Sequence, residues 1–293
     1  MKIGVGFPYA TIGNDPDLYR TYALHAEGLG FAHLTFVDHV LGSEHARRDP
    51  PLEGPYTEES IMHEPLTLMG WLAAQTQRIE LVTSILILAQ RQAVLVAKQA
   101  AEVQLLSRGR LRLGVGTGWN YLEYEGMGVP YAQRGRRLEE QVQVMRKLWT
   151  EPLLDYKGEF HRISRSGQRP LLGTPVPIWF GGFSNAAQDR CARVGDGFTF
   201  MRMTSLSIAA IERIRRQATQ LGRDPEALGF ETILGEQWPI RVKGLQTTLG
   251  DALEQWRVAG GTHATVMVPG EGKELLSSLD RIAQDAGGLL RET

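Results

Sequence analysis

Cysteine and long apolar runs are scarce in this chain of 293 residues. The single cysteine, Cys191, excludes an internal disulfide framework and any metal site built from several cysteines. No apolar run approaches the roughly 20 residues that a membrane-spanning helix needs. The opening residues, MKIGVGFPYATIGND, lack the apolar stretch of a secretory signal. We therefore expect a soluble, cytoplasmic protein.

An excess of charge of one sign is also missing. The 32 Lys and Arg residues are balanced by 33 Asp and Glu residues, and the formal net charge is −1. Proteins that bind nucleic acid or an anionic membrane usually carry a surplus or a patch of basic residues. We therefore expect a small-molecule substrate as partner, and neither nucleic acid nor a membrane.

The signatures of several enzyme classes are absent as well. The chain contains no Gly-Lys-Ser/Thr, which excludes a P-loop, and no HExxH pair for a metal ion. The segment GVGTGW at 114–119 has tryptophan where a dinucleotide fingerprint has its last glycine, so a Rossmann site is not indicated. Asp38 and Glu236 could serve as the two carboxylates of a glycosidase, but nothing marks them as a pair. We expect no metal site.

A regular alternation of strand and helix patterns runs through the chain. Short apolar segments predict strands at 2–7, 33–37, 79–88, 111–115, 177–180, 197–200, 228–234 and 263–268. Apolar residues at helical spacing predict helices at 16–29, 92–106, 134–150, 185–194, 208–221, 249–259 and 273–286, and one that opens at 64–65. Eight strand–helix units predict a parallel sheet covered by helices, and in a chain of this size they favour a closed (β/α)8 barrel.

Two stretches exceed what a minimal barrel needs. One is 40–62, rich in Glu, Arg and Pro, and the other is 151–176, in which residues 155–163 resemble a small hairpin. No linker separates the units, so we expect one α/β domain over 1–293 with these two stretches as insertions. An open, doubly wound sheet is the alternative architecture.

Polar and glycine-rich residues follow the predicted strands, where a barrel has its active site. Asp38-His39 follows the second strand, and a histidine there can move a proton, bind a ligand oxygen or be satisfied by local backbone. Gly116–Asn120 follows the fourth strand and Gly181–Asn185 the fifth. Each turn could bind phosphate before a helix N-terminus, or could be a tight turn that needs positive φ.

The stretch 79–149 carries the most specific pattern, with LRLGVGTGWNYLEYEGMG at its centre. Together with PVPIWFGGFSNAAQDRCARVGDGF at 175–198 and with Asp38-His39, it closely resembles the bacterial luciferase-like family of flavin- and deazaflavin-dependent oxidoreductases. The resemblance covers essentially the whole chain and is strongest to the branch that uses the deazaflavin coenzyme F420. It implies a luciferase-like (β/α)8 TIM barrel with insertion segments, in agreement with the unit count.

The resemblance also implies roles for particular residues. Asp38 and His39 would lie beside the cofactor ring and act in catalysis, with His39 as acid or base nearest the reacting carbon. Ser84-Ile85 matches a bulge in strand three, where a non-prolyl cis peptide backs the ring. The remaining implied cofactor contacts are Thr117, Gly118 and Asn120 after strand four, and Gly181, Gly182 and Phe183, which would hold the phosphate side chain.

Some positions depart from the family's better-known patterns. Pro8 and Tyr9 stand where some sugar-phosphate dehydrogenases of the family carry glutamate, and Trp119 replaces an acidic residue that some members have after Thr-Gly. A sugar-phosphate substrate is therefore not supported. We expect the substrate pocket to be shaped by the 40–62 loop and by Met201, Arg202, Glu236 and Trp238.

The function that the resemblance implies is hydride transfer between F420 and a small organic substrate. One alternative is an FMN-dependent monooxygenase that uses oxygen and reduced flavin from a partner reductase. Others are a non-catalytic flavin-binding protein and a hydrolase barrel without a cofactor. The acidic tail of F420 could meet Arg47, Arg48, Arg91 and Arg165, which could equally be solvated surface residues. The family leads us to expect a homodimer.

Overall fold

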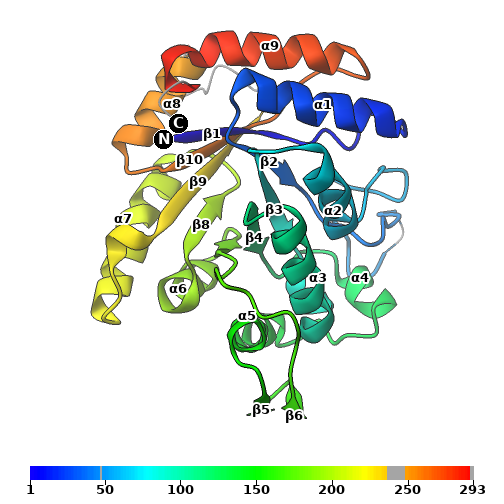
Figure 1. The fold of residues 1–293 in the computed structure, drawn as a ribbon, viewed down its shortest axis with the longest axis vertical. Coiled ribbons are helices and arrows are strands. Elements are labelled where there is room, and N and C mark those ends of the chain that lie inside the picture. The colour runs from blue at the N-terminus through cyan, green and yellow to red at the C-terminus, as the bar shows by residue number, and fades with distance from the viewer. Residues whose placement is uncertain (47, 236–247, 291–293) are drawn as a thin grey trace.

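The computed structural model describes residues 1–46, 48–235 and 248–290, and its central feature is a closed barrel of eight parallel strands (Figure 1). The strands are β1 (Lys2–Gly6), β2 (His33–Phe36), β3 (Glu80–Leu86), β4 (Leu111–Val115), β7 (Ile178–Gly181), β8 (Gly197–Phe200), β9 (Gly229–Leu234) and β10 (His263–Val266). Around the barrel their order is β1-β10-β9-β8-β7-β4-β3-β2. Because β1 pairs with both β2 and β10, the predicted barrel is confirmed and the open sheet is excluded.

Helices cover the outside of this barrel. They are α1 (Pro16–Leu29), α2 (Pro65–Gln75), α3 (Ala93–Leu106), α4 (Tyr121–Gly126), α5 (Arg134–Thr150), α6 (Asn185–Val194), α7 (Ser205–Gln220), α8 (Leu249–Val258) and α9 (Glu274–Ala286). Local signals set their limits. In α1, Asp15 caps the first turn and Pro16 opens the helix, whereas Gly30 ends it in the left-handed region at φ 92°.

Two helix boundaries differ from the sequence prediction for local reasons. α7 begins at residue 205 and not at 208, because Thr204 and Ser207 form a reciprocal capping box at its first turn. α4 is a short helix that the periodicity analysis did not predict, and it is capped by the side chain of Asn120. Six residues are too few to show a helical period.

The two long connections differ in structure. The described residues between β2 and α2, which include 40–46 and 48–62, form loops beside the carboxyl end of the barrel. The segment after α5 contains the antiparallel pair β5 (Leu154–Lys157) and β6 (Arg162–Ser166), which confirms the predicted hairpin. This hairpin projects away from the barrel, at the bottom of Figure 1.

Charged residues occupy the interior of the barrel towards its amino-terminal end. Glu231 of β9 pairs with His33 Nε2 at 2.7 Å and with Arg112 Nη1 at 2.8 Å. It also accepts a hydrogen bond of 2.8 Å from Thr265 Oγ1. Burial acts to raise the pKa of Glu231, but Arg112 and His33 outweigh it and hold the pKa well below its usual range. The network joins four strands across the barrel.

Trp179 fills the amino-terminal end of the same interior. The guanidinium of Arg112 lies over its ring, 4.2 Å from the centroid. A Cβ atom at Gly197 or Gly229, the first residues of β8 and β9, would collide with the indole. These two glycines therefore make room for a bulky aromatic side chain at this end of the barrel.

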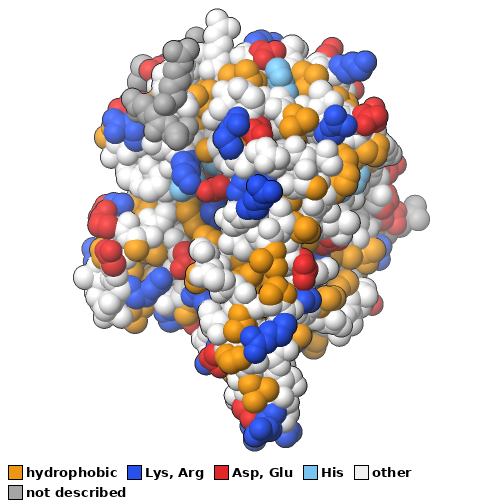
Figure 2. Space-filling view, in the orientation of Figure 1, with side chains coloured by type: hydrophobic (Ala, Val, Ile, Leu, Met, Phe, Trp, Pro, Cys, Tyr) orange, Lys and Arg blue, Asp and Glu red, His pale blue; other side chains and the backbone are white. Residues whose placement is uncertain are grey.

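The surface shows no field of one charge sign on the side drawn in Figure 2, where basic and acidic side chains are interspersed. Among the described residues, no helix combines the length and the apolar character that crossing a bilayer would require.

Candidate active site

The predicted catalytic pair follows directly after β2, at the carboxyl end of the barrel. Asp38 is 2% exposed and is fully engaged with the chain after β3. Its carboxylate accepts hydrogen bonds from Ile87 N at 2.8 Å and from Arg91 Nε and Nη2 at 3.2 and 2.7 Å. Burial raises the pKa of Asp38, although Arg91 opposes the rise. These contacts make Asp38 an anchor for the segment that follows β3.

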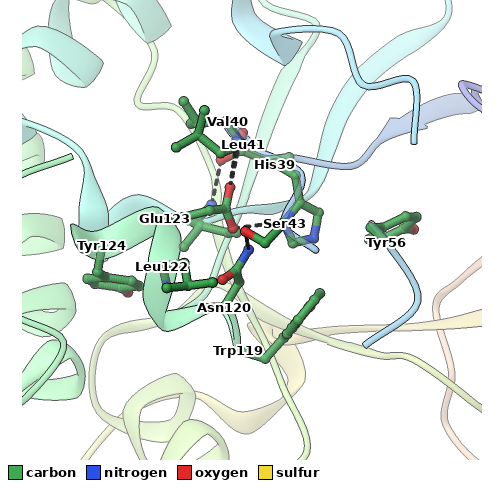
Figure 3. A network of polar contacts seen from close by, with 12 residues as sticks. His39, Val40, Leu41, Ser43, Tyr56, Trp119, Asn120, Leu122, Glu123 and Tyr124 are labelled. Carbon is green, nitrogen blue, oxygen red and sulfur yellow. Dashed lines mark hydrogen bonds and ion pairs between the residues drawn. The ribbon is translucent and has the colours of Figure 1, made fainter. Parts of the chain in front are cut away.

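His39 points to a different partner. Its Nδ1 lies 2.9 Å from Oε2 of Glu123, a residue of α4 that is completely buried. The other carboxylate oxygen of Glu123 accepts backbone hydrogen bonds from Val40 N at 2.6 Å and Leu41 N at 3.2 Å. Figure 3 shows these contacts, with Glu123 on one side of the imidazole and Tyr56 and Trp119 on the other.

The sequence analysis missed Glu123. Its signal is present but ambiguous, because Asn120 and Glu123 have the spacing of a capping box at a helix start. Asn120 does cap α4, through Leu122 N at 3.0 Å. Glu123, however, turns away from its own helix towards the loop after β2. Only the tertiary structure brings these two segments together.

Aromatic rings form the walls around His39. The ring of Tyr56 lies 4.9 Å from the imidazole and that of Trp119 lies 5.5 Å away. His45 packs edge-on against the same indole at 6.0 Å. A Cβ atom at Gly54 would collide with Trp119. The 40–62 loop is therefore packed onto the loop after β4, and together they enclose one side of His39.

The predicted bulge in β3 is confirmed. The register between β3 and β4 shifts between Thr83 and Leu86, and the Ser84–Ile85 peptide bond is cis. Ile85 is partly exposed and contacts the glycines of the neighbouring strands. A Cβ at Gly116 would collide with Ile85 Cδ1, and one at Gly181 would lie 2.6 Å from Ile85 Cγ2. The two glycines thus accommodate the side chain that the bulge directs between β4 and β7.

The loop after β4 is held by contacts within the protein. The carbonyl of Thr117 accepts a hydrogen bond from Tyr124 Oη, and Gly118 has a positive φ of 64°. A side chain at Gly118 would also come within 2.8 Å of Ile87, so only glycine fits this turn. Asn120 donates to Ser43 Oγ at 3.2 Å. The cofactor contacts predicted for this loop stay predictions.

The loop after β7 leads into α6 as the sequence indicates. Gly182 has a φ of 144°, and Ser184 caps α6 by accepting from Ala187 N at 3.3 Å. Phe183 between them is 84% exposed. An exposed aromatic ring beside a helix N-terminus is available to a ligand, and the predicted cofactor role of Gly181, Gly182 and Phe183 stays a prediction.

Three buried polar side chains near the carboxyl end lack a hydrogen-bond partner among the described residues. They are Tyr9 Oη, Ser84 Oγ and the whole side-chain amide of Gln90. The residues are 4%, 3% and 1% exposed. Burial raises the pKa of Tyr9 well above its ordinary value, so the phenol keeps its proton. Unpaired buried polar atoms are costly, and such atoms near the carboxyl ends of β1 and β3 are typical of a ligand site.

The arginines that could meet the acidic tail of F420 lie in different parts of the structure. Arg91 is mostly buried and is committed to Asp38 and to Glu64, the latter at 3.2 Å. Arg165 lies on the β5–β6 hairpin, which connects α5 to β7 and so belongs to the end of the barrel opposite His39. The structure therefore does not support these two as tail-binding residues. Arg48 is exposed.

The structure describes two of the four residues that were predicted to shape the substrate pocket together with the 40–62 loop. Met201 is partly exposed and Arg202 is exposed, and both directly follow β8, at the predicted end of the barrel. Arg47, Glu236 and Trp238 lie outside the described residues.

Cys191 is completely buried, and its thiol lies 3.1 Å from the carbonyl of Gly197. Burial raises the pKa of this thiol to about 12. This agrees with a packing role.

A pocket of about 740 Å³ opens at the opposite end of the barrel, lined by residues of α5 and by residues at or just before the starts of β7, β9 and β10. Trp179, Asp196 and His263 contribute to it. Nothing at this end adjoins His39, so the pocket is separate from the candidate site. In the described part of the chain, no three His, Cys, Asp or Glu side chains are grouped so as to hold a metal ion.

Comparison with known proteins identifies the family. The sequence pattern of the luciferase-like monooxygenases matches residues 3–235, most of the barrel described above. The chain belongs to the luciferase-like monooxygenase family. Its members are oxidoreductases that act on small molecules, and the proteins similar to this chain in sequence or in fold include both flavin- and F420-dependent enzymes.

Individual relatives show how far the likeness extends. An uncharacterized protein of Mycobacterium tuberculosis is 32% identical over 223 residues, which cover 72% of this chain and 76% of the relative. Pyrimidine monooxygenase RutA of Allorhizobium ampelinum is 30% identical over 226 residues, covering 71% and 60%. The match therefore spans about 60% of the length of that enzyme, which is less than two thirds.

Solved structures share the fold of this chain at low sequence identity. An F420-dependent secondary alcohol dehydrogenase, solved with an F420–acetone adduct, superposes with a TM-score of 0.76 at 16% identity and covers 97% of this chain and 98% of its own. EDTA monooxygenase from Chelativorans sp. BNC1 has a TM-score of 0.78 at 13% identity, covering 100% and 93%. The barrel with its insertions is thus the common scaffold of both kinds of enzyme.

Proposed function

We propose that this protein is an F420-dependent oxidoreductase that transfers a hydride between the deazaflavin and a small organic substrate. The observation that carries the proposal is the His39–Glu123 pair at the mouth of the barrel, beside the Ile85 bulge. Removing a hydride from an alcohol carbon requires a base for the hydroxyl proton. A histidine held by a buried carboxylate is suited to that task near neutral pH.

The residues at this end of the barrel fit a planar cofactor. Ile85, partly exposed between Gly116 and Gly181, would support the ring, and Gln90 and Tyr9 have unpaired polar groups for its heteroatoms. The N-terminus of α6 with Ser184 and Phe183 would hold the phosphate side chain. When bound, the deazaflavin supplies or accepts the hydride.

Side chains of the protein would transfer the substrate proton and exclude water from the site. His39 would exchange a proton with the substrate oxygen, and Glu123 would stabilise the charged imidazolium. Tyr56 and Trp119 would cover the reacting atoms, since their rings lie within 6 Å of the imidazole. Excluding water strengthens these electrostatic interactions and protects the hydride from side reactions.

A second candidate function is an FMN-dependent monooxygenase supplied by a flavin reductase. The observation that favours it is the 34% identity, over 170 residues, to pyrimidine monooxygenase RutA of Escherichia coli. That match covers 55% of this chain and 47% of the relative. Both cofactors present a ring and a phosphate, so the same site residues would serve.

Titration of the purified protein with F420 and with FMN, followed by cofactor fluorescence, distinguishes the two candidates. We expect tighter binding of F420, and loss of its visible absorbance when alcohols are added without oxygen. A preference for FMN would favour the monooxygenase, and binding without turnover on any substrate would favour a flavin-binding protein. Failure to bind either cofactor would contradict all three.

A matched pair of variants tests whether the cofactor binds at the predicted loop after β7. Phe183→Ala removes an exposed ring beside α6, and Val258→Ala removes an exposed apolar side chain, 73% exposed, at the end of α8. Loss of one stacking contact of about 1 kcal/mol weakens binding about 5-fold. We expect that effect for Phe183→Ala and unchanged affinity for Val258→Ala.

We also propose that the protein forms a homodimer through α3. Four apolar side chains of this helix are about half exposed, namely Val94, Leu95, Leu105 and Leu106. They flank the exposed Lys98–Glu102 ion pair on the outer face of the helix. An apolar stripe of this kind is more typical of an interface than of free surface. We expect the protein to act in the cytoplasm.

A further inference from the structure

We propose that Glu123 is a positioning residue that holds the proton of the neutral His39 ring on Nδ1 and leaves Nε2 as the reactive atom. The inference deepens the proposed function, but only its turnover measurement rests on that function. The tautomer of a histidine is set by the hydrogen bond that one ring nitrogen makes. Here that bond is the 2.9 Å contact between Nδ1 and Glu123 Oε2.

The two oxygens of the Glu123 carboxylate have different partners, which supports this assignment. Oε1 accepts two backbone N–H groups, from Val40 and Leu41, and these bonds orient the side chain. Oε2 is then directed at His39. Because Glu123 is completely buried, water does not compete for either oxygen. The carboxylate can only accept from His39, so Nδ1 must donate.

The opposite edge of the imidazole is left available. Within the described parts of the chain, Nε2 of His39 has no hydrogen-bond partner, and the rings of Tyr56 and Trp119 lie beside it. Asp38, the adjacent acid, is occupied by Arg91 and Ile87 and does not reach this edge. A substrate hydroxyl entering between the aromatic walls would therefore meet an unprotonated nitrogen, which can accept its proton.

Glu123→Gln is the decisive substitution. Its amide oxygen can keep the two backbone hydrogen bonds, which places the amide NH2 opposite His39 Nδ1. An NH2 group donates, so Nδ1 must become the acceptor and the ring proton must move to Nε2. The change preserves size and shape while reversing the tautomer, as a carboxylate-to-amide change does in the serine protease triad.

The chain offers a matched control in Glu140. Its Oε1 lies 2.9 Å from Nδ1 of His161, and its carboxylate likewise accepts backbone N–H groups, including Phe160 N at 3.0 Å. This second pair links α5 to the β5–β6 hairpin, which precedes β7 in the chain, whereas His39 follows the carboxyl end of β2. Glu140→Gln therefore makes the same chemical change outside the site.

Two-bond proton–nitrogen correlation spectra of 15N-histidine protein, recorded where His39 is neutral, report the tautomers directly. His39→Gln identifies the His39 signals among those of the seven histidines. We expect the Nδ1–H form in the wild-type protein, the Nε2–H form in Glu123→Gln, and an unchanged His39 in Glu140→Gln. A wild-type ring protonated only on Nε2, or identical His39 spectra in wild type and Glu123→Gln, would overturn the proposal.

Turnover provides the second measurement. General acid–base catalysis contributes about 10²–10⁴-fold, so we expect Glu123→Gln to lower kcat about 100-fold or more with little change in KM. Glu140→Gln should keep wild-type rates. If the tautomer reverses but neither protein oxidises or reduces any substrate with F420, the proposed function has failed while the role of Glu123 stands. A reversed tautomer with wild-type kcat would overturn Nε2 as the reactive atom.

Discussion

At the scale of single residues, Asp38 and His39 are neighbours in sequence but contact different segments of the chain. Asp38 meets the segment after β3, and His39 meets α4. The catalytic roles predicted for the two residues can therefore be tested separately, because only His39 faces the rings of Tyr56 and Trp119.

His39→Ala should abolish most turnover without affecting cofactor binding. The substitution removes the proposed acid or base but none of the Ile85 platform or the α6 loop. We expect kcat to fall about 10²–10⁴-fold while the dissociation constant for F420 stays within a factor of about 3. Stopped-flow absorbance and fluorescence titration measure the two quantities. Unchanged turnover in this variant would rule out the assignment.

Asp38→Asn should act mainly on stability. The buried guanidinium of Arg91 would lose its charged partner, and breaking a buried ion pair costs about 3–5 kcal/mol. Because Glu64 still contacts Arg91, we expect a loss of about 3 kcal/mol in the free energy of unfolding, measured with urea. Glu64→Gln, at a more exposed partner, should cost less than about 1 kcal/mol. Lost turnover with unchanged stability would instead support the catalytic role predicted from the sequence.

At the scale of elements, the bulge in β3 organises its neighbours β4 and β7. The irregular register directs Ile85 between these strands, and Gly116 and Gly181 provide the space. Glycines that looked in the sequence like a cradle for phosphate thus have a packing function within the barrel. Any cofactor would then rest on a surface built by three strands.

Gly116→Ala tests this packing. Gly116 does not have a positive φ, so the added methyl group acts through its collision with Ile85 alone. Overpacking of this kind costs about 1–3 kcal/mol. Ile85→Ala should relieve most of the cost in the double variant, which urea unfolding detects as non-additivity. Gly28→Ala, in α1 with open space around it, should instead stabilise the protein slightly. Additive costs for Gly116→Ala and Ile85→Ala would refute the contact.

The sequence predicted the elements better than the site. Caps such as Asp15 and Gly30 and the apolar periods are local, so the barrel and most helix limits follow from the sequence alone. Glu123 could not be predicted as a partner of His39, because 84 residues separate them and only barrel closure brings α4 to β2. The burial of Arg91 against Asp38 is equally non-local, and its sequence context resembles that of a surface arginine.

At the scale of the whole molecule, the two ends of the barrel have different tasks. The amino-terminal end is packed by Trp179 and by the charged network around Glu231. The carboxyl end has small residues, unpaired polar groups and a histidine backed by a buried acid. The groups that stabilise the barrel thus lie at its amino-terminal end and the proposed catalytic groups at its carboxyl end, as is usual for this fold.

The apolar face of α3 predicts the assembly state. Light scattering should give a mass of about twice the 32.6 kDa of one chain. Leu106→Glu, at a position 57% exposed, should shift the protein towards monomers without lowering the stability of the fold. Leu221→Glu, at an exposed position just after α7, is the matched control and should leave the mass unchanged. A wild-type mass of one chain would contradict the dimer.

The charged network also predicts how stability depends on pH. Burial and the charge of Arg112 lower the pKa of His263 from 6.5 to about 2, so the folded protein does not bind this proton at pH 5. The unfolded chain does bind it, and the free energy of unfolding must therefore decrease as the pH falls below 6.5. Between pH 6.5 and 5 this one histidine accounts for about 1.5 kcal/mol.

His263→Gln should remove that part of the pH dependence. Burial also lowers the pKa of His63, so some dependence of the same sign stays in the variant. The low pKa of Glu231 acts below this range, because its stabilisation is present above about pH 4.5 and is lost only as the pH falls further. Urea unfolding at pH 6.5 and pH 5 should therefore show a smaller loss of stability in His263→Gln than in wild type. His25→Gln, at a partly exposed residue of α1, should show the wild-type loss, and equal losses in all three proteins would contradict a His263 that stays neutral in the folded protein.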